Sequence, residues 1–474
     1  MNENIFYTKF SELENRLDPL YYSGEVNGFF RKIQFPLKSL HHFVVKIDSG
    51  IGAGKDDQSD LENGVLHLRP TNIDKNGYLK LDKNIYIPFN TKYSKVEIGD
   101  VVFNNTNSQE LVGKTLFIEN SIDAYYSNHM TRIKINDELN PNYLWIILNF
   151  YQQKKIFFNL CTNWNNQSGV GLELLKNLKI PIAPENIQNK LISIIKESYN
   201  QKEKKEKKAQ NKLDSIDKYL LNELGIQQFS DEKESLKDRV FLRKFSEISG
   251  DRFDADYYRN RYYENIHYLS QNKNFKLLTL GEISLNIFQG VGQNLTAKQD
   301  NILLKVKNIM NDNKIDFENV EFIENIPETK KLINGDIITP FIGEAIKKYK
   351  FSVFNQPQNN FNYTVDNNTG VIRLKEKYNP IYVSAFFMSS IGKILIEQLS
   401  GGGGVPFLGS NSANKLLVPI PVLNNNVDFD KQNMIADNIQ KLRDEAQALK
   451  DEAIEIFDEA KQEVEKMILG DTNA

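Results

Sequence analysis

The chain is a tandem duplication, and this feature constrains its fold more than any other. Eight short motifs recur in the same order in both halves of the 474 residues, at offsets between 236 and 244. The paired segments are Arg16–Tyr22 with Arg252–Tyr258, Phe35–Leu40 with Phe275–Leu280, Ser49–Gly52 with Gln289–Gly292, Asn72–Ile73 with Asn308–Ile309, Ile98–Val102 with Asn334–Ile338, Asn140–Tyr143 with Asn379–Tyr382, Ile180–Ile182 with Val418–Ile420, and Gln188–Asn189 with Gln432–Asn433. This period is far longer than a solenoid repeat. Each half is therefore expected to hold a whole domain followed by a long helix.

Two stretches predict long helices. From Lys431 to Leu469 apolar residues recur at alternating steps of four and three, without glycine or proline, which is a heptad pattern. Glu185 to Leu224 is the matching stretch of the first half. Its centre, 201–212, carries six Lys against two Glu, whereas the middle of the C-terminal stretch is acidic. This charge pattern favours antiparallel pairing within one chain; two independent helices and a homodimeric coiled coil are the alternatives.

The predicted fold class is α+β, with two tandem-repeated mixed α/β domains joined by two long helices that form an antiparallel coiled coil. The predicted limits are 1–184 for the first domain, 185–226 for the central helix, 227–422 for the second domain and 423–474 for the C-terminal helix. Within the domains, 141–158 and 380–399 are each expected to form one helix that begins at a proline. Strands are expected at 44–47, 65–69, 101–104, 115–118, 302–306, 337–341 and 371–374.

Composition limits the class of protein. No run of apolar residues approaches the 18 or so that a membrane-spanning helix needs, and the N-terminus lacks the pattern of a signal peptide. The single cysteine, Cys161, excludes an internal disulfide framework and a cysteine metal cluster. A cytoplasmic protein is expected. The net charge of −3 argues against a uniformly basic surface but allows a local basic face.

The sequence offers no catalytic motif. Gly52–Lys55 suggests a phosphate-binding loop, but Ser49 and Asp56 occupy positions where that motif needs glycine and a hydroxyl residue. None of the five histidines has metal-ligand spacing to another ligand. The absence of a nucleophile, a metal site and a cofactor loop favours a binding or scaffolding protein over an enzyme.

Two similar domains on a helical spacer suit a long ligand with two short elements, and duplex DNA is the candidate. Half-sites on one face of DNA lie about 34–36 Å apart, within the roughly 50 Å length of such a helix. Loops rich in Asn, Gln, Lys and Arg carry the donors and acceptors that read base edges. The candidate DNA-binding residues are Lys55, Arg69, Thr71, Asn72, Asn105, Asn107, Gln109, Lys114, Asn165 and Gln167 in the first half, and Gln289, Gln293, Asn294, Lys305, Lys307, Asn308, Lys347, Lys348 and Asn411 in the second.

With these residues the chain resembles, over essentially its whole length, the specificity subunit of type I restriction-modification systems. The resemblance rests on three duplicated features in fixed order: Arg-x-Asp-x-x-Tyr-Tyr, a Gly-Asp-Φ-Φ strand (Φ is apolar), and a proline pair followed by Gln-Asn and a long helix. It implies two target-recognition domains that read the halves of an interrupted DNA site, and a helix pair that sets the gap.

The resemblance also implies the partners. Two methyltransferase subunits, joined in some complexes by two restriction subunits, would dock on the helix pair and methylate DNA in phage defence. S-adenosylmethionine, and ATP with Mg²⁺ where restriction subunits are present, would bind those partners, so no cofactor and no catalysis are expected in this chain. The alternatives are a specificity subunit of another DNA-modification or phage-defence assembly, a stand-alone enzyme, and a pure coiled-coil scaffold.

Overall fold

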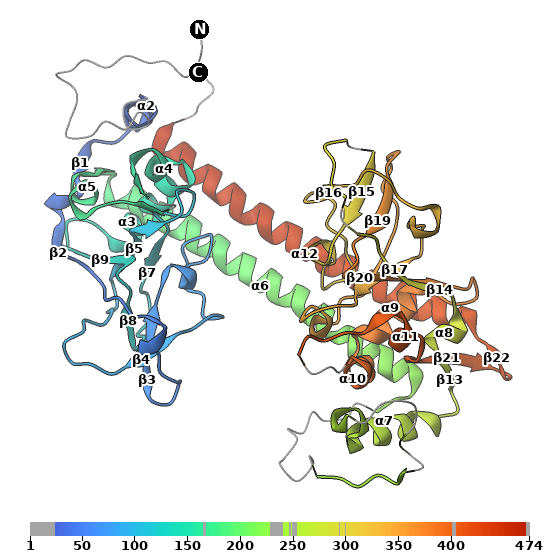
Figure 1. Ribbon diagram of the computed structural model, residues 1–474. Helices are drawn as coiled ribbons and strands as arrows, with labels where there is room; N and C mark the ends of the chain where they lie inside the picture. The colour runs from blue at the N-terminus through green and yellow to red at the C-terminus, as the bar shows by residue number, and fades with distance from the viewer. Residues whose placement is uncertain are drawn as a thin grey trace. The chain divides into compact units, whose positions relative to one another are not determined.

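The structure is a computed structural model that describes residues 24–164, 167–227, 240–245, 248, 254–292, 294–298, 300–400 and 404–470. The chain divides into two compact units (Figure 1). The first unit comprises 1–203 with 453–474, and the second comprises 204–452. The helices α6 (Glu185–Leu224) and α12 (Phe429–Leu469) each contribute residues to both units. Both long helices are confirmed, and α12 begins two residues before the predicted start.

The first unit is built on a four-stranded antiparallel sheet in the order β2-β9-β5-β7, beside a three-stranded sheet β4-β3-β8 in which β3 and β8 are parallel. Its strands are β1 (Leu37–Ser39), β2 (Val44–Ser49), β3 (Gly64–Leu68), β4 (Tyr86–Pro88), β5 (Val101–Asn104), β6 (Thr106–Asn107), β7 (Thr115–Phe117), β8 (Ala124–Tyr126), β9 (Met130–Ile135), β10 (Thr162–Trp164), β11 (Gln167–Gly169) and β12 (Lys179–Pro181). Its shorter helices are α2 (Glu25–Lys32), α3 (Pro141–Gln153), α4 (Ile156–Leu160) and α5 (Leu172–Asn177).

The second unit repeats this topology. Its four-stranded sheet has the order β14-β20-β17-β18, and its three-stranded sheet, β16-β15-β19, again contains one parallel pair. Its strands are β13 (Phe275–Thr279), β14 (Ser284–Gln289), β15 (Asn301–Leu304), β16 (Glu321–Phe322), β17 (Ile337–Pro340), β18 (Ser352–Val353), β19 (Asn362–Val365), β20 (Thr369–Leu374), β21 (Leu417–Leu423) and β22 (Asn426–Val427). Its shorter helices are α7 (Asn260–Ser270), α8 (Leu280–Ile283), α9 (Pro380–Met388), α10 (Ser390–Leu399) and α11 (Gly409–Asn414). The α+β fold and its duplication are confirmed.

The repeated Gly-Asp motif has a structural role in both units. Each glycine adopts a left-handed conformation, with φ of 90° in the first copy and 88° in the second, which a residue without a Cβ adopts at little cost. The buried carboxylates of Asp100 and Asp336 each accept the backbone N–H of the residue three positions earlier, at 2.7 and 2.9 Å. Asp336 also accepts Nε and Nη2 of Arg373 at 2.8 and 2.7 Å, while Arg132 lies 3.9 Å from Asp100.

The repeated Asn-Pro-x-Tyr motif fastens a helix to the strand that precedes each long helix. Asn140 and Asn379 cap α3 and α9 through their side-chain oxygens. The buried hydroxyl of Tyr143 donates to the carbonyl of Pro181 at 2.9 Å, and the hydroxyl of Tyr382 donates to the carbonyl of the equivalent proline in β21. These contacts explain why the asparagine and the tyrosine recur in the sequence.

The two helices predicted to be single are each broken. The stretch 141–158 forms α3 and α4, because Lys155 adopts a left-handed φ of 57° between them. The stretch 380–399 forms α9 and α10, bent by 79° at Ser389. The Ser389 hydroxyl accepts the N–H of Gly392 and so begins a new helix. A Cβ at Gly392 would lie 2.1 Å from the carbonyl oxygen of Phe386, so only glycine permits this close packing.

Within each unit α6 and α12 pair antiparallel. In the second unit three polar pairs join the helices, and successive pairs are seven residues apart on both. The pairs are Lys205 with Glu452, Lys212 with Glu445 at 2.6 Å, and Tyr219 with Asn438 at 2.9 Å. In the first unit the ring of Tyr199 meets the edge of Phe457 at 5.7 Å. The antiparallel arrangement and the contacts between the basic and acidic centres agree with the prediction.

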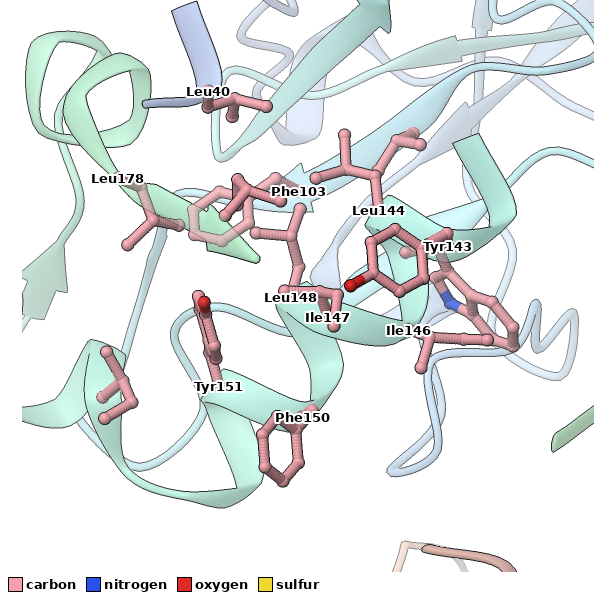
Figure 2. Packing of buried hydrophobic residues seen from close by; sticks show 14 of the residues in the cluster. Leu40, Phe103, Tyr143, Leu144, Ile146, Ile147, Leu148, Phe150, Tyr151 and Leu178 are labelled. Atoms are coloured by element: carbon pink, nitrogen blue, oxygen red, sulfur yellow. The ribbon is translucent and has the colours of Figure 1, made fainter. Parts of the chain in front are cut away.

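Each unit has a large core that includes the long helices and a smaller one between its sheets. In the first unit the large core collects buried side chains of α3 around Leu40, Phe103 and Leu178 (Figure 2). It also contains Phe457, Ala460, Val464 and Ile468 of α12. The equivalent core of the second unit contains residues of α9, α10 and both long helices. Each unit therefore covers the apolar stripe of the part of α6 and of α12 that belongs to it.

Among the described residues no single helix has the length and apolar character to cross a membrane; the bent pair of α9 and α10 meets the test only when taken together.

We predict that Asp336→Ala lowers the free energy of local unfolding of β17 by about 3 kcal/mol, because the Arg373 guanidinium and a buried N–H lose their acceptor. Hydrogen exchange of the β17 amides measures this quantity. The matched control is Glu344→Ala, which removes the carboxylate of an exposed pair with Lys347 and is expected to change stability by less than about 0.5 kcal/mol. Equal effects of the two variants would contradict the structural role of the motif.

Candidate nucleic-acid interface

Five segments of the first unit are held side by side by backbone hydrogen bonds. Ile51 forms two backbone hydrogen bonds of 2.9 Å with the segment 126–128. In the same segment, the N–H of Ser127 donates to the carbonyl of Leu68 at 2.9 Å. Asn105 donates to the carbonyl of His129 at 3.0 Å and accepts from Val170 at 2.9 Å. We call the group the first loop cluster; it comprises 50–55, 68–72, 104–109, 126–129 and 162–170, with 165 and 166 outside the described residues.

The second unit holds the equivalent segments together in the same way. Val291 donates to Val365 at 2.9 Å, and Asp366 donates to Leu304 at 2.9 Å. Phe341 donates to Asn368 and accepts from Leu408, both at 2.9 Å. The second loop cluster comprises 289–294, 304–308, 340–348, 365–368 and 404–411, of which 293 is not described.

A glycine at the same place in each cluster makes the close packing possible. A Cβ at Gly50 would lie 1.9 Å from the carbonyl oxygen of Tyr126, and a Cβ at Gly290 would lie 2.1 Å from that of Val365. Both distances are far below van der Waals contact, so no other residue fits. Backbone packing therefore explains the first glycine of the duplicated motif Ser49–Gly52 and Gln289–Gly292.

Many predicted residues present exposed side chains on the two clusters. Lys55, Thr71 and Gln167 are exposed in the first, and Asn294, Lys307, Lys347, Lys348 and Asn411 in the second. Arg69, Asn107, Gln109, Gln289 and Lys305 are partly exposed. Amide and cationic side chains of this kind can bond to base edges and phosphates. Pairing of β11 with β6 further brings Asn107 opposite Ser168, so two separately predicted loops lie together.

Other predicted residues are used inside their units. The buried amides of Asn72 and Asn308 each accept the N–H of the residue three positions earlier and donate to loop carbonyls. Asn105 donates to the carbonyl of Asn128 at 3.2 Å and to the Thr131 hydroxyl at 2.8 Å. These side chains shape the loops from within, and their occupied amides leave little for a DNA base.

Lys114 belongs to the same supporting group. Its Nζ donates to the carbonyls of Pro70 and Ile73 at 3.3 and 2.8 Å, and Nζ of Lys350 makes the equivalent bond to Ile309 at 2.6 Å. Burial lowers the pKa of both amines, because an apolar environment disfavours the charged form. Each lysine thereby fixes the turn that carries neighbouring loop residues.

Electrostatic pairing differs among the remaining cations. Lys305 and Lys307 both contact Glu321, at 2.5 and 3.3 Å, and the hydrogen bond from Lys305 lowers the pKa of that carboxyl. Lys347 pairs with Glu344 at 2.9 Å on an exposed turn. Nε of Arg69 is buried and has no hydrogen-bond partner among the described residues. Exposed lysines exchange partners at small cost, so Lys307 and Lys347 remain available to phosphates, whereas Lys305 is mostly covered.

Some predicted residues lie outside the described part of the chain. They are Asn165 and Gln293 among the candidate DNA-binding residues, together with the segment Arg16–Tyr22, Arg252 and three residues of the Gly401–Gly404 run. Of the second Arg-x-Asp-x-x-Tyr-Tyr motif, Asp254 is described, and its carboxylate caps the turn at Tyr257.

Two exposed aromatic residues were not predicted as site residues. Trp164 is 46% exposed in the first cluster and Phe407 is 50% exposed in the second. Each ring lies over a glycine: a Cβ at Gly169 would be 2.3 Å from the Trp164 ring, and one at Gly409 would be 2.6 Å from the Phe407 ring. The sequence signal was an aromatic residue in a polar loop shortly before a glycine. Exposed rings so held offer flat apolar surface for stacking.

No group of three or more ligand side chains that could hold a metal occurs among the residues described. Of the five histidines, His67 is buried in β3, and its Nε2 lies 3.2 Å from the Ile51 carbonyl. Burial lowers its pKa, so His67 is neutral at pH 7 and helps to hold the first loop cluster.

Comparison with known proteins gives one match at the sequence level and several in structure. No family model matches the chain. A stretch of 130 residues, 27% of the chain, is 31% identical to a putative type I restriction enzyme MjaX specificity subunit of Methanocaldococcus jannaschii. The chain resembles a type I restriction specificity subunit. The prediction of this resemblance is confirmed, although the match spans only 30% of the relative's length.

Two solved structures are also similar to the chain. The S subunit of a type I restriction-modification system from M. genitalium is 12% identical, with 92% of this chain and 96% of that chain covered and a TM-score of 0.44. A chain from a structure on complex assembly and conformational transition of the type I R-M system is 11% identical, with 91% and 97% covered and a TM-score of 0.48.

We predict that a DNA duplex carrying the recognised sequence changes the fluorescence of Trp164. The chain has two tryptophans, and Trp145 is buried with its Nε1 bonded to two carbonyls, so the change reports Trp164 alone. Trp164→Phe is expected to abolish it, and Trp164→Ala to weaken binding by about 1 kcal/mol through lost apolar contact. A fluorescence change that persists in Trp164→Phe would contradict the prediction that DNA contacts Trp164.

Proposed function

We propose that this chain is the DNA-reading, non-catalytic subunit of a type I restriction-modification complex, in which the two loop clusters read the two halves of an interrupted DNA site. The observation that carries the proposal is the pair of loop clusters. Both clusters are built on equivalent strands, an equivalent glycine and an equivalent buried asparagine, yet their exposed residues differ. Two readers derived from one ancestor and directed at different sequences would have this character.

The exposed side chains fit direct readout of DNA. Gln167, Asn294 and Asn411 carry amides that pair with adenine, and Lys347 and Lys348 carry cations for guanine or phosphate. The supporting residues Asn72, Asn308 and Lys114 fix the loops in advance, so little conformational entropy is lost on binding. Arg69, which is partly exposed, is the further base-reading side chain of the first cluster.

We further propose that the α6–α12 pair sets the length of the gap between the half-sites and docks two methyltransferase subunits, with restriction subunits in a larger complex. Those partners would flip and methylate a base in each half-site with S-adenosylmethionine. The role of this chain is then to position the partners over the sequence in the cytoplasm, where the host DNA lies. A specificity subunit of another DNA-modification or phage-defence assembly would use the same surfaces.

The proposal is tested by methylome sequencing of host cells with and without the chain. We predict one interrupted motif that disappears from the methylome when the chain is absent, since the partners then lack their reader. Purified alone, the chain is expected to transfer no methyl group. Methylation that is unchanged without the chain, or methyl transfer by the isolated chain, would refute the proposed function.

Removal of one heptad from both long helices tests the spacing role in the same assay. Deletion of 201–207 together with 450–456 removes residues that pair across the helices and preserves the heptad pattern. It shortens the pair by about 10 Å, so the gap is expected to shrink by about 3 base pairs with both half-sites unchanged. Deletion of 201–207 alone, the control, breaks the register. An unchanged gap in the double deletion would show that the helix pair does not set the gap length.

A further inference from the structure

The second unit has an open groove of about 650 Å³ beside the paired helices. None of its lining residues belongs to the second loop cluster. The groove is lined by α6, α9, α10, α12 and the turn after β15. The lining residues that matter most are Leu213, Asp312, Ala385, Met388 and Arg443.

Comparison of the two units shows that the groove lies where the first unit holds a cluster of aromatic side chains. The equivalent place in the first unit is lined by Asn76, Ile146, Asn149 and Phe457, but leaves only about 30 Å³. Three large aromatic side chains fill it there: Tyr78 stacks on Tyr199 at 3.3 Å, and its ring meets Trp145 edge-on at 5.0 Å. Their counterparts in the second unit are Lys314 for Tyr78, Ser384 for Trp145 and Arg443 for Tyr199.

Shared backbone contacts support this correspondence. Asp74 N–H donates to the Tyr78 carbonyl at 2.9 Å, and Met310 N–H donates to the Lys314 carbonyl at 2.9 Å. Trp145 Nε1 bonds the carbonyl of Gly77, while Ser384 Oγ bonds the side chain of the equivalent Asn313, and both of these turn residues have positive φ. The backbone around the groove is therefore equivalent to the backbone around the aromatic cluster, but the three aromatic rings are absent.

Arg443 gives the groove its charge. It is only 5% exposed, Nη1 has no hydrogen-bond partner among the described residues, and Nη2 faces the thioether of Met388 at 3.8 Å. Burial lowers the pKa of Arg443 to about 10, with Asp312 and Asp444 opposing, so the guanidinium is charged at neutral pH. A buried cation without a carboxylate is costly, and a flexible methionine is the side chain most readily moved aside by a ligand.

The three acids that line the groove, Asp214, Asp217 and Asp312, each contact another group as well. Asp217 accepts the N–H of Ser390 at 3.0 Å, and Asp214 accepts Nε2 of Gln210 at 2.7 Å. Asp312 lies 3.7 Å from Lys450, which also lines the groove. Asp312 and Asp444 act on Arg443 from a distance, and among the described residues no carboxylate forms an ion pair within 4.0 Å of its guanidinium, which leaves a place for a carboxylate from a partner.

We propose that this groove is a docking site for a protein partner that inserts an aromatic side chain next to an Asp or Glu. The aromatic ring takes the space that rings fill in the first unit, and the carboxylate pairs with the Arg443 guanidinium in a bidentate contact. Burial of a ring and a fully desolvated ion pair is the usual composition of an interface hot spot. This inference goes beyond DNA reading and stands on the groove alone.

Selection of displayed random 12-residue peptides on the full chain tests the proposal. The expected result is enrichment of sequences in which Phe, Tyr or Trp adjoins Asp or Glu. A synthetic peptide with the enriched sequence should lose at least ten-fold in affinity when its acid is replaced by the amide. The same loss is expected with the Arg443→Met chain, and with the Ala385→Ile chain, which introduces the side chain of the first unit. The matched control, Lys441→Met, changes an exposed cation of the same helix and should bind normally.

Thermal unfolding of the same variants separates binding from folding. Arg443→Met is expected to keep or raise the Tm, because it removes a buried unpartnered charge. A Tm well below that of Lys441→Met would give Arg443 a structural role and overturn the proposal. Recovery of no peptides, peptides without the aromatic–acid pair, equal binding to Arg443→Met, or displacement of the peptide by short duplex DNA would also overturn it.

Discussion

The antiparallel pairing of α6 with α12 is the interaction on which both units depend. The first half of α6 would expose its apolar stripe without the last half of α12, and Phe457, Ala460, Val464 and Ile468 lie in the same core as α3. The second unit uses the remaining halves of both helices in the same way. Residues from opposite ends of the sequence therefore complete the first unit, and heptad-spaced polar pairs fix direction and register.

Duplication gives each unit the same frame and leaves its surfaces free to differ. The frame consists of contacts that recur in both copies: a left-handed glycine before Asp100 and Asp336, a tyrosine hydroxyl on the carbonyl of a proline, and a glycine under a crossing strand. The loop clusters vary around this frame, as does the space beside α12. One copy fills that space with Tyr78, Trp145 and Tyr199, and the other leaves a groove at Arg443. The loop clusters and the space beside α12 differ between the copies, and these are the places where binding is proposed.

The sequence predicted the frame well, because the frame is local. Heptad spacing and the Asn-Pro helix starts each act within a few residues, and the sequence predicted both. The Gly-Asp motif was predicted as part of a strand, whereas its glycine forms the turn before β5 and before β17. The breaks at Lys155 and Ser389 were missed because a left-handed residue and a serine cap outweigh the helical preference of the apolar residues around them.

The candidate interface was predicted only in part. Loop composition located the clusters, but burial of Asn72 and Asn308 depends on turns closed by their own amides. Exposure of Trp164 and Phe407 depends on glycines beneath their rings. The groove could not be found from the sequence, because Asp312, Ala385 and Arg443 are distant in the chain and nothing local shows that they line one space.

The most direct test of the account is photo-crosslinking of the assembled complex to DNA. A photoreactive phenylalanine replaces the exposed Thr71 in one sample and the exposed Lys347 in another, in the full chain with its methyltransferase subunits and a duplex carrying the methylated motif. The account predicts that the first position crosslinks to one half-site and the second position to the other half-site. Crosslinks from both positions to the same half-site, or to neither, would contradict it.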